Sequence, residues 1–443
     1  MTMQRHRPAS VIALALLSLA SVLLIGCSGL TATAPVRVPG GLFHGGVHGG
    51  QQPVVNAEIL LYAAGNTGYG SSYPYGTATS LLGGASVRTD IGGNFSVTGL
   101  YTCPSASTPV YLVARQGSPG PGSPNNPNIA AMAALGACGN LTSSTYISVN
   151  EVTTVASVWA LSPFMSGITN VGTSPANALG LTNAFASVNK LVSTDTGTVS
   201  GPALPTGAIL PVAKINTLAD ILAACINSAG GVAGDGSLCG KLFDYTTVNG
   251  IAPTDTITAA LNIAQHPNTQ TANLTYLASP SSPFQPTLIA APSDFSLVVT
   301  YSGGGLSQPK AIALDSSGSV WLPNAGNSSV TKLSNSGAAL SGVNGFTAGS
   351  LGAPSAIAID SSGNAWVASS SLNTLTVLNP SGIAGLGYNG IGISMPSSIA
   401  IDASSNVWVA NSTGVTQISS AGVLTTFSTA GIATPTAIVI NPK

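Results

Sequence analysis

A thirteen-residue stretch occurs three times in the last part of the chain and decides its fold. Pro309–Trp321 reads PKAIALDSSGSVW, Pro354–Trp366 reads PSAIAIDSSGNAW and Pro396–Trp408 reads PSSIAIDASSNVW. A fourth copy begins at Pro435 as PTAIVIN. Repetition at a period of about 20 to 50 residues is typical of solenoids, propellers and arrays.

The spacing inside each copy is constant. The aspartate stands six residues after the proline and six before the tryptophan, and successive aspartates are 45 and 42 residues apart. Each copy is followed by a second apolar segment and a turn with a glycine, namely Val330–Leu333 with Gly337, Leu375–Leu378 with Gly382, and Val415–Ile418 with Gly422. Four short strands in roughly 43 residues indicate a propeller blade, so residues 292–443 predict an incomplete β-propeller of about 3.5 blades.

The repeated unit P-x-x-I-A-x-D-x-x-G-x-x-W-V-A resembles the NHL-repeat and streptogramin-lyase-like β-propellers. Closed members of that group have about six blades, and their lyase chemistry uses a histidine base and a metal-assisted carboxylate. This chain has no histidine after His266, and the only acids from residue 292 onward are Asp294 and the three turn aspartates. We therefore expect structural roles in the repeats and no catalytic site, metal or cofactor. The aspartates should accept main-chain hydrogen bonds and the tryptophans should pack between blades: Asp315, Trp321, Asp360, Trp366, Asp402 and Trp408.

The N-terminus has the pattern of an export signal. Arg5 and Arg7 precede an uncharged run, Val11–Ile25, which is short for a bilayer span and fits a secretory segment. The run ends Leu24-Ile25-Gly26-Cys27, which resembles the lipobox of bacterial lipoproteins. The resemblance implies a signal peptide over 1–26, lipid on Cys27 and a tether over 27–38. Ser28 is not an aspartate, which implies anchoring in the outer membrane. An ordinary signal peptide with a chance cysteine is the alternative.

Charged residues make up only 5% of the 443 residues, 11 basic and 12 acidic, against about 25% in average proteins. So few basic side chains exclude a nucleic-acid-binding surface. Four cysteines remain after Cys27. An even number in an exported chain predicts disulfides, with three connectivities open. We favour the two pairs that are local in sequence: Cys103–Cys138 and Cys225–Cys239.

The first segment after the tether, residues 39–116, predicts a β-sandwich. Strands are expected around Val54–Tyr62, Val87–Asp90, Phe95–Val97 and Val110–Ala114. The order of a G-x-V stretch, a P-V-x-x-A-x-I strand and a T-D-x-x-G-x-F hairpin resembles carboxypeptidase-regulatory-like, or Cna-B-like, domains, which implies a non-catalytic spacer. Residues 66–76 (NTGYGSSYPYG) are expected to form an exposed loop, either passive or stacking on a sugar or protein partner. Residues 117–127 are expected to be a Pro/Gly linker.

Residues 128–291 change to a helical period and predict a separate domain of four to six short helices. The helices are expected over Glu151–Met165, Pro175–Leu191, Asn216–Ile226 and Thr254–His266, with Thr217 and Thr254 as caps. Glu151 and Asp220 are expected as caps or on solvated faces. The fold class expected for the whole chain is multidomain and mainly β.

Few residues favour catalysis or metal binding. His44 and His48 stand in a glycine-rich stretch and are expected as solvated turn residues rather than metal ligands. The segment 234–242 lacks P-loop spacing. We therefore expect a non-enzymatic, lipid-anchored scaffold that binds a protein or a glycan, with a homodimer that completes the propeller as a further candidate. An extracytoplasmic lyase or lactonase is the alternative.

Overall fold

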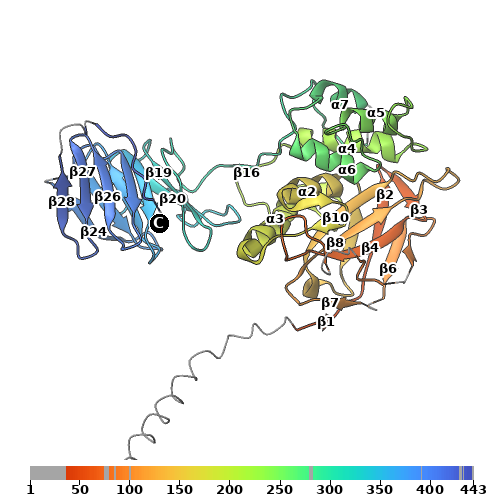
Figure 1. Ribbon diagram of the computed structural model, residues 1–443, viewed down its shortest axis with the longest axis horizontal. Helices are drawn as coiled ribbons and strands as arrows, with labels where there is room; N and C mark the ends of the chain where they lie inside the picture. Colours follow the sequence, from red (N-terminus) through yellow and green to blue (C-terminus); the bar gives the residue numbers. More distant parts are fainter. Residues whose placement is uncertain are drawn as a thin grey trace, which may run out of the picture.

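The structure is a computed structural model and describes residues 36–73, 79–83, 86–98, 101–278, 283–390, 392–428, 432 and 434–441. Figure 1 shows two bodies joined by a single connection near β16. One body holds the N-terminal sheets and the helices, and the other holds the repeats. The expected signal peptide and Cys27 lie outside the described residues.

Two sheets form the N-terminal sandwich. One has the strand order β10-β8-β4-β5, and the other has the order β11-β2-β3-β9 with β6 paired to β2. A further short pair, β1 with β7, lies beside them. The eleven strands are β1 (Val38–Pro39), β2 (Phe43–Gly49), β3 (Gln52–Val55), β4 (Glu58–Ala63), β5 (Val87–Arg88), β6 (Asn94–Val97), β7 (Thr102–Cys103), β8 (Pro109–Arg115), β9 (Ser118–Pro119), β10 (Ala130–Ala137) and β11 (Tyr146–Val149).

The sandwich does not end at residue 116. Strand β9 comes from the expected linker, and β10 and β11 come from the expected helical domain. Strand β10 pairs antiparallel with β8, and β11 pairs parallel with β2. The first five residues of β10, Ala130–Ala134, are buried on both faces because the helices cover the face turned away from the other sheet. These residues have mostly short side chains and do not alternate between apolar and polar, so the sequence does not indicate a strand here.

The helices share one hydrophobic core with the sandwich, rather than forming a separate domain. A single cluster of buried side chains runs from Phe43 on β2 to Phe295, beyond the last helix. Helices α2, α3 and α6 all contact β10. The helices are α2 (Glu151–Leu161), α3 (Ala178–Leu191), α4 (Val212–Ile226), α5 (Leu238–Tyr245), α6 (Thr256–Gln265) and α7 (Thr271–Leu277), with 3-10 turns at Cys138–Asn140, Ser162–Phe164 and Pro175–Asn177.

The helix caps differ from those expected. Asn150 caps α2 by accepting from the Thr153 N–H, and Asp255 caps α6 by accepting from the Thr258 N–H. Thr217 is not a cap, because α4 begins five residues earlier at Val212. Its hydroxyl lies inside the protein, where it donates to the Ala213 carbonyl and accepts from the Leu288 N–H.

Two two-stranded sheets lie in the connections between helices, and a third pairs one such connection with the segment after α7. They pair β12 (Met165–Gly167) with β13 (Asn170–Val171), β14 (Val192–Ser193) with β15 (Thr198–Val199), and β16 (Ala208–Ile209) with β17 (Thr300–Tyr301). The last pair joins the two bodies. Strand β17 pairs with β16 and with no blade strand, because Phe295 is buried in the N-terminal core and fixes the path of the chain.

The repeats form three consecutive antiparallel sheets, which we call blades 1, 2 and 3. Blade 1 has three strands and blades 2 and 3 have four each. Blade 1 packs on blade 2 and blade 2 packs on blade 3. Three blades are fewer than the roughly four of the smallest propellers, and the described residues do not close a ring. The strands are β18 (Ala313–Leu314), β19 (Val320–Asn324), β20 (Ser329–Leu333), β21 (Pro354–Ile359), β22 (Ala365–Ser369), β23 (Thr374–Leu378), β24 (Ala384–Asn389), β25 (Ser398–Ile401), β26 (Val407–Asn411), β27 (Gly414–Ile418) and β28 (Leu424–Phe427).

Both expected disulfides are present. Cys103 at the end of β7 bonds to Cys138 just after β10, and Cys225 on α4 bonds to Cys239 on α5. Disulfides are typical of proteins exported to an oxidising compartment. Among the helices of the described residues, none has the length and apolar character needed to cross a bilayer.

Candidate functional site

The turn aspartates of the three blades make the same set of hydrogen bonds. In each blade, one carboxylate oxygen accepts from the main-chain N–H groups two and four residues later, at 2.8–3.0 Å. The other oxygen accepts from the indole N–H of the tryptophan six residues later, at 3.0 Å in all three blades. This side-chain bond explains why the aspartate and the tryptophan are always six residues apart in the sequence.

These contacts keep the aspartates ionised. The Trp408 indole and the groups of Asn406 lower the pKa of Asp402 to about 2. Burial is the largest single influence on Asp315 and Asp360 and would raise their pKa, but the donors together outweigh it and the pKa of both is lowered. Such carboxylates are anchors for the turn and poor general bases at neutral pH.

Each tryptophan also lies against an aromatic ring from the end of its own blade. Trp321 lies 5.8 Å from Phe346, Trp366 lies 5.5 Å from Tyr388, and Trp408 lies 5.8 Å from Phe427, measured between ring centroids. The last two pairs are stacked within 23° of parallel. Each blade therefore presents an aromatic pair beside a carboxylate.

A lysine fills the space between blades 1 and 2 beside Trp321, which we call the first slot; the equivalent space beside Trp366 is the second slot. Lys332 lies opposite Trp321 in the register of β19 and β20. Its ammonium group is 4.5 Å from the Trp321 ring centroid, 3.2 Å from Asp315 Oδ2, and donates to the Pro380 carbonyl of blade 2 at 3.0 Å. Trp321 is 0% exposed. The repeat pattern did not single out Lys332, because the other two copies have Val377 and Gln417 at the same position of the second segment.

The slot between blades 2 and 3 has an aspartate and a tryptophan in the same places but no lysine. Val377 occupies the register position opposite Trp366. A cavity of about 170 Å³ remains, lined by Asp360, Ser361, Ser362, Trp366, Tyr388, Ser405, Ser419 and Ser420. Trp366 and Val377 are both partly exposed.

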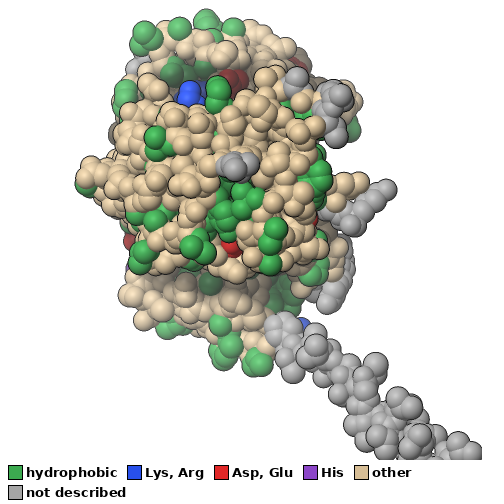
Figure 2. Space-filling model, turned by 90° about the vertical axis from the view of Figure 1, so that its left-hand side faces the viewer, with side chains coloured by type: hydrophobic (Ala, Val, Ile, Leu, Met, Phe, Trp, Pro, Cys, Tyr) green, Lys and Arg blue, Asp and Glu red, His purple; other side chains and the backbone are tan. Residues whose placement is uncertain are grey.

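Blade 3 presents a face to which no further complete sheet is packed in the described residues. Trp408 and Gln417 lie opposite each other in the register of β26 and β27, as Trp321 and Lys332 do in blade 1. Phe427 is 39% exposed, and all four residues of β28 are exposed. The segment 434–441 contacts this blade, where the Ser397 hydroxyl donates to the Pro435 carbonyl. Figure 2, which views the molecule from the end of the repeat body, shows a mostly uncharged surface with scattered apolar side chains.

Glu151 and Asp220, which were expected at helix caps or on solvated faces, are both buried in the N-terminal body. Glu151 on α2 is 0% exposed and Asp220 on α4 is 1% exposed. Both Glu151 oxygens accept from the Gly50 N–H, at 2.9 and 3.0 Å. Gly50 has φ +61° in the turn between β2 and β3, and a Cβ there would lie 2.8 Å from Pro283, so glycine is required.

Burial shifts both acids in the same direction. It raises the pKa of Glu151 to about 8, against the opposing effect of the Gly50 N–H, and the nearby Asp220 raises it further. Burial likewise raises the pKa of Asp220 to about 7, although Oδ1 accepts from the Phe284 N–H. Asp220 Oδ2 has no hydrogen-bond partner among the described residues. Glu151 and Asp220 therefore lie on two helices that pack together, α2 and α4, and their ionisation lowers the stability of the N-terminal body.

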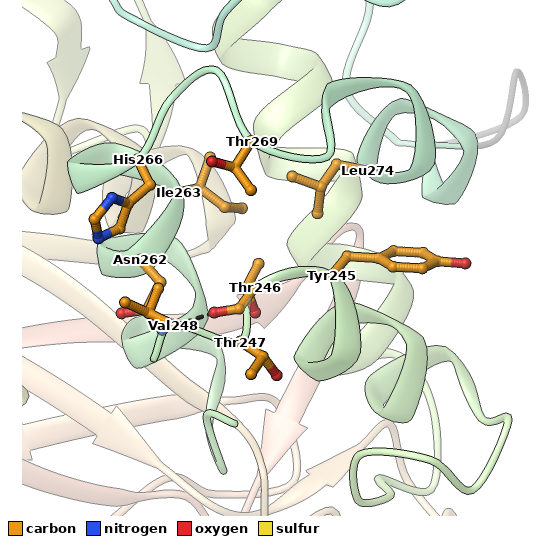
Figure 3. Close-up of a pocket in the computed structure, with 9 residues that line it drawn as sticks. All are labelled: Tyr245, Thr246, Thr247, Val248, Asn262, Ile263, His266, Thr269 and Leu274. Atoms are coloured by element: carbon orange, nitrogen blue, oxygen red, sulfur yellow. Dashed lines mark hydrogen bonds between the residues drawn. The ribbon is translucent and has the colours of Figure 1, made fainter. Parts of the chain in front are cut away.

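The histidines form no catalytic arrangement in the part of the chain described. His44 lies edge-on to Tyr146, with ring centroids 5.4 Å apart, and burial lowers the pKa of His48. Figure 3 shows His266 at the rim of a small pocket between α5, α6 and α7, where the Asn262 side chain donates to the Thr246 carbonyl. The pocket holds about 10 Å³, roughly one water molecule. No group of three or more His, Cys, Asp or Glu suited to a metal ion occurs among the described residues.

No protein-family model and no curated protein matches the chain. Solved structures similar to it include streptogramin B lyase, 19% identical with a TM-score of 0.25 over 28% of this chain and 42% of that one. Virginiamycin B lyase from Staphylococcus aureus is 16% identical, with a TM-score of 0.27 over 30% of this chain and 46% of that one.

The extracellular domain of a hybrid two-component system from B. thetaiotaomicron is 17% identical, with a TM-score of 0.25 over 30% of this chain and 17% of that one. The chain spans less than half of the length of each of these proteins. The assignment of blades in this chain rests on its own hydrogen-bonded sheets and their repeated contacts.

Proposed function

We propose that the protein is an exported, lipid-anchored binding protein without enzymatic activity, which uses its blades as an interaction surface. The observation that carries this proposal is the exposed face of blade 3. Trp408, Gln417 and Phe427 stand in blade 3 where Trp321, Lys332 and Phe346 stand in blade 1, and Phe427 is 39% exposed. Aromatic side chains on an exposed, weakly charged face are typical of protein interfaces.

The partner that we propose for this face is a second copy of the chain. The surface around it is nearly uncharged, so two copies meet without like-charge repulsion. Such pairing is isologous, as in most homodimers.

Sedimentation velocity tests this pairing. The mature chain, with Cys27 replaced by serine to keep it free of lipid, is expected to sediment as a dimer. Phe427→Asp places a charge in the contact and should weaken association by about 30-fold or more, the effect of losing an interface hot spot. Leu386→Asp on β24 of blade 2 is the matched control, because Leu386 is also exposed, and it should leave the dimer intact. A wild-type monomer at every concentration tested would rule out pairing.

The lipid anchor is proposed from the stretch Leu24-Ile25-Gly26-Cys27 behind a charged start. Mass spectrometry of the mature N-terminus is expected to find a diacylated or triacylated Cys27 in the outer-membrane fraction. Cys27→Ser should abolish the modification and release the protein from the membrane. A mature chain that begins at another residue would contradict this anchoring.

A lyase or lactonase is the alternative function, and nothing in the blades favours it. The repeats contain no histidine, and the turn aspartates are held ionised by the indole and main-chain donors. We expect no turnover of lactone or cyclic ester substrates by the purified protein, with or without divalent metal. Activity that is lost in Asp360→Asn would overturn both the structural role of this residue and the non-enzymatic assignment.

A further inference from the structure

The repeat allows one slot between blades to be compared with the next. Trp321 lies opposite Lys332 in blade 1, and Trp366 lies opposite Val377 in blade 2. Pro380, whose carbonyl accepts from Lys332, stands two residues after Leu378 at the end of β23. Ser420 stands two residues after Ile418 at the end of β27, so it takes the place of Pro380 in the next blade. The second slot thus repeats the aspartate and tryptophan of the first, with Ser420 in place of Pro380 and Tyr388 in place of Phe346.

The main difference between the slots is the cation. Lys332 supplies an ammonium group that lies on the Trp321 face and pairs with Asp315. Val377 has no such group, and a cavity of about 170 Å³ lies between the blades, with Asp360, Trp366, Tyr388 and Ser420 in its lining. Since one water needs roughly 10–15 Å³ of such space, the slot holds a chain of several heavy atoms.

The charge of the second slot is also unbalanced. Asp315 has the basic partner Lys332, whereas Asp360 has no ion-pair partner among the described residues. Its Oδ2 accepts from the Asn364 side chain and from the Trp366 indole, both neutral donors. The slot therefore combines a carboxylate without a counterion and a partly exposed indole face, two of the three features that bind the ammonium group in the first slot, where the Pro380 carbonyl is the third.

We propose that the slot between blades 2 and 3 binds a primary ammonium group carried on an unbranched alkyl chain, as in a lysine side chain. Lys332 is the template: its four-carbon chain and ammonium group occupy the equivalent slot within this same protein. The assignment goes beyond the proposed function, because this slot lies between two blades and not on the open face of blade 3. Its failure leaves the proposed pairing through Phe427 untouched.

The test uses the full mature chain labelled with 5-fluorotryptophan, whose four tryptophans give separate fluorine NMR signals. Butylammonium is the probe, and 1-butanol, of equal chain length and no charge, is the control. Butylammonium should shift the Trp366 signal saturably and leave Trp321 unchanged, since Lys332 already fills that slot. Val377→Lys should abolish the response of Trp366, and Asp360→Asn should weaken binding by about tenfold or more.

A reciprocal variant makes the test independent of any single substitution. Lys332→Val should open the first slot, so that Trp321 now responds to butylammonium. Titrations with Nα-acetyl-lysine methylamide and with putrescine are then compared. Tighter binding of the first indicates a peptide lysine as the natural ligand, and tighter binding of the second indicates a free diamine. The Trp408 signal, from blade 3 of the same body, reports that the blades of each variant are folded. An equal response to 1-butanol, or a Trp366 response that survives in folded Val377→Lys, would overturn the proposal.

Discussion

The free energy of unfolding of the N-terminal body should fall as the pH rises from about 5 to about 8. The folded-state pKa of Glu151 is raised to about 8 and that of Asp220 to about 7, above their values in the unfolded chain. In this range the unfolded chain releases protons that the folded protein retains. Each carboxyl therefore lowers the stability by roughly 1.4 kcal/mol per pH unit, and Glu151 alone by about 4 kcal/mol over the range.

Glu151→Gln isolates this effect. The amide oxygen still accepts from the Gly50 N–H but does not ionise, so the variant should lose less stability with rising pH and exceed the wild type near pH 8. Asp195→Asn is the control, because Asp195 is exposed and its removal changes the net charge equally. Urea unfolding followed by the Trp159 fluorine signal measures the free energy. Equal pH slopes for the wild type and Glu151→Gln would contradict the assigned burial.

Removing the Cys103–Cys138 disulfide should cost the N-terminal body roughly 4 kcal/mol, through the entropy of the loop that it closes in the unfolded chain. The bond joins β7 to the end of β10 across 35 residues, and both cysteines are completely buried. The double variant Cys103→Ala with Cys138→Ala is expected to unfold at a lower urea concentration, measured by the same Trp159 signal.

The second disulfide gives the comparison. Cys225 and Cys239 are 14 residues apart and join α4 to α5, so their double alanine variant should lose roughly 3 kcal/mol. The two variants are matched in side-chain change and in complete burial. A larger loss from the shorter loop, or no loss from either, would show that native-state contacts rather than loop entropy control these bonds.

Repetition made the blades predictable. The constant spacing of proline, aspartate and tryptophan identifies the strands and turns, because each blade uses the same carboxylate-to-indole bond. The sequence did not predict that Lys332 and Val377 would distinguish two binding slots, because these residues differ between copies and lie outside the repeated thirteen residues. The residue that distinguishes one slot from the other is therefore identified only from the strand register in the structure.

The N-terminal body was predicted less well, for a different reason. Its strands β4, β6 and β8 follow an apolar pattern and were expected, but Ala130–Ala134 on β10 is buried on both faces by groups distant in sequence. Glu151 looks like an acid in the first turn of a helix, where solvation is usual. Its burial depends on the turn at Gly50, which lies 101 residues away. Such long-range contacts leave no local signal.

Cross-linking at residue 427 tests most directly whether the open blade face binds a second copy. The lipidated protein is reconstituted in vesicles from equal amounts of unlabelled and 15N-labelled chains, with a photoreactive phenylalanine analogue in place of Phe427 or, as the control, of Leu386. We predict cross-linked peptides that combine a light and a heavy chain from position 427 and none from position 386. Cross-links from position 427 that remain within one chain would contradict the account.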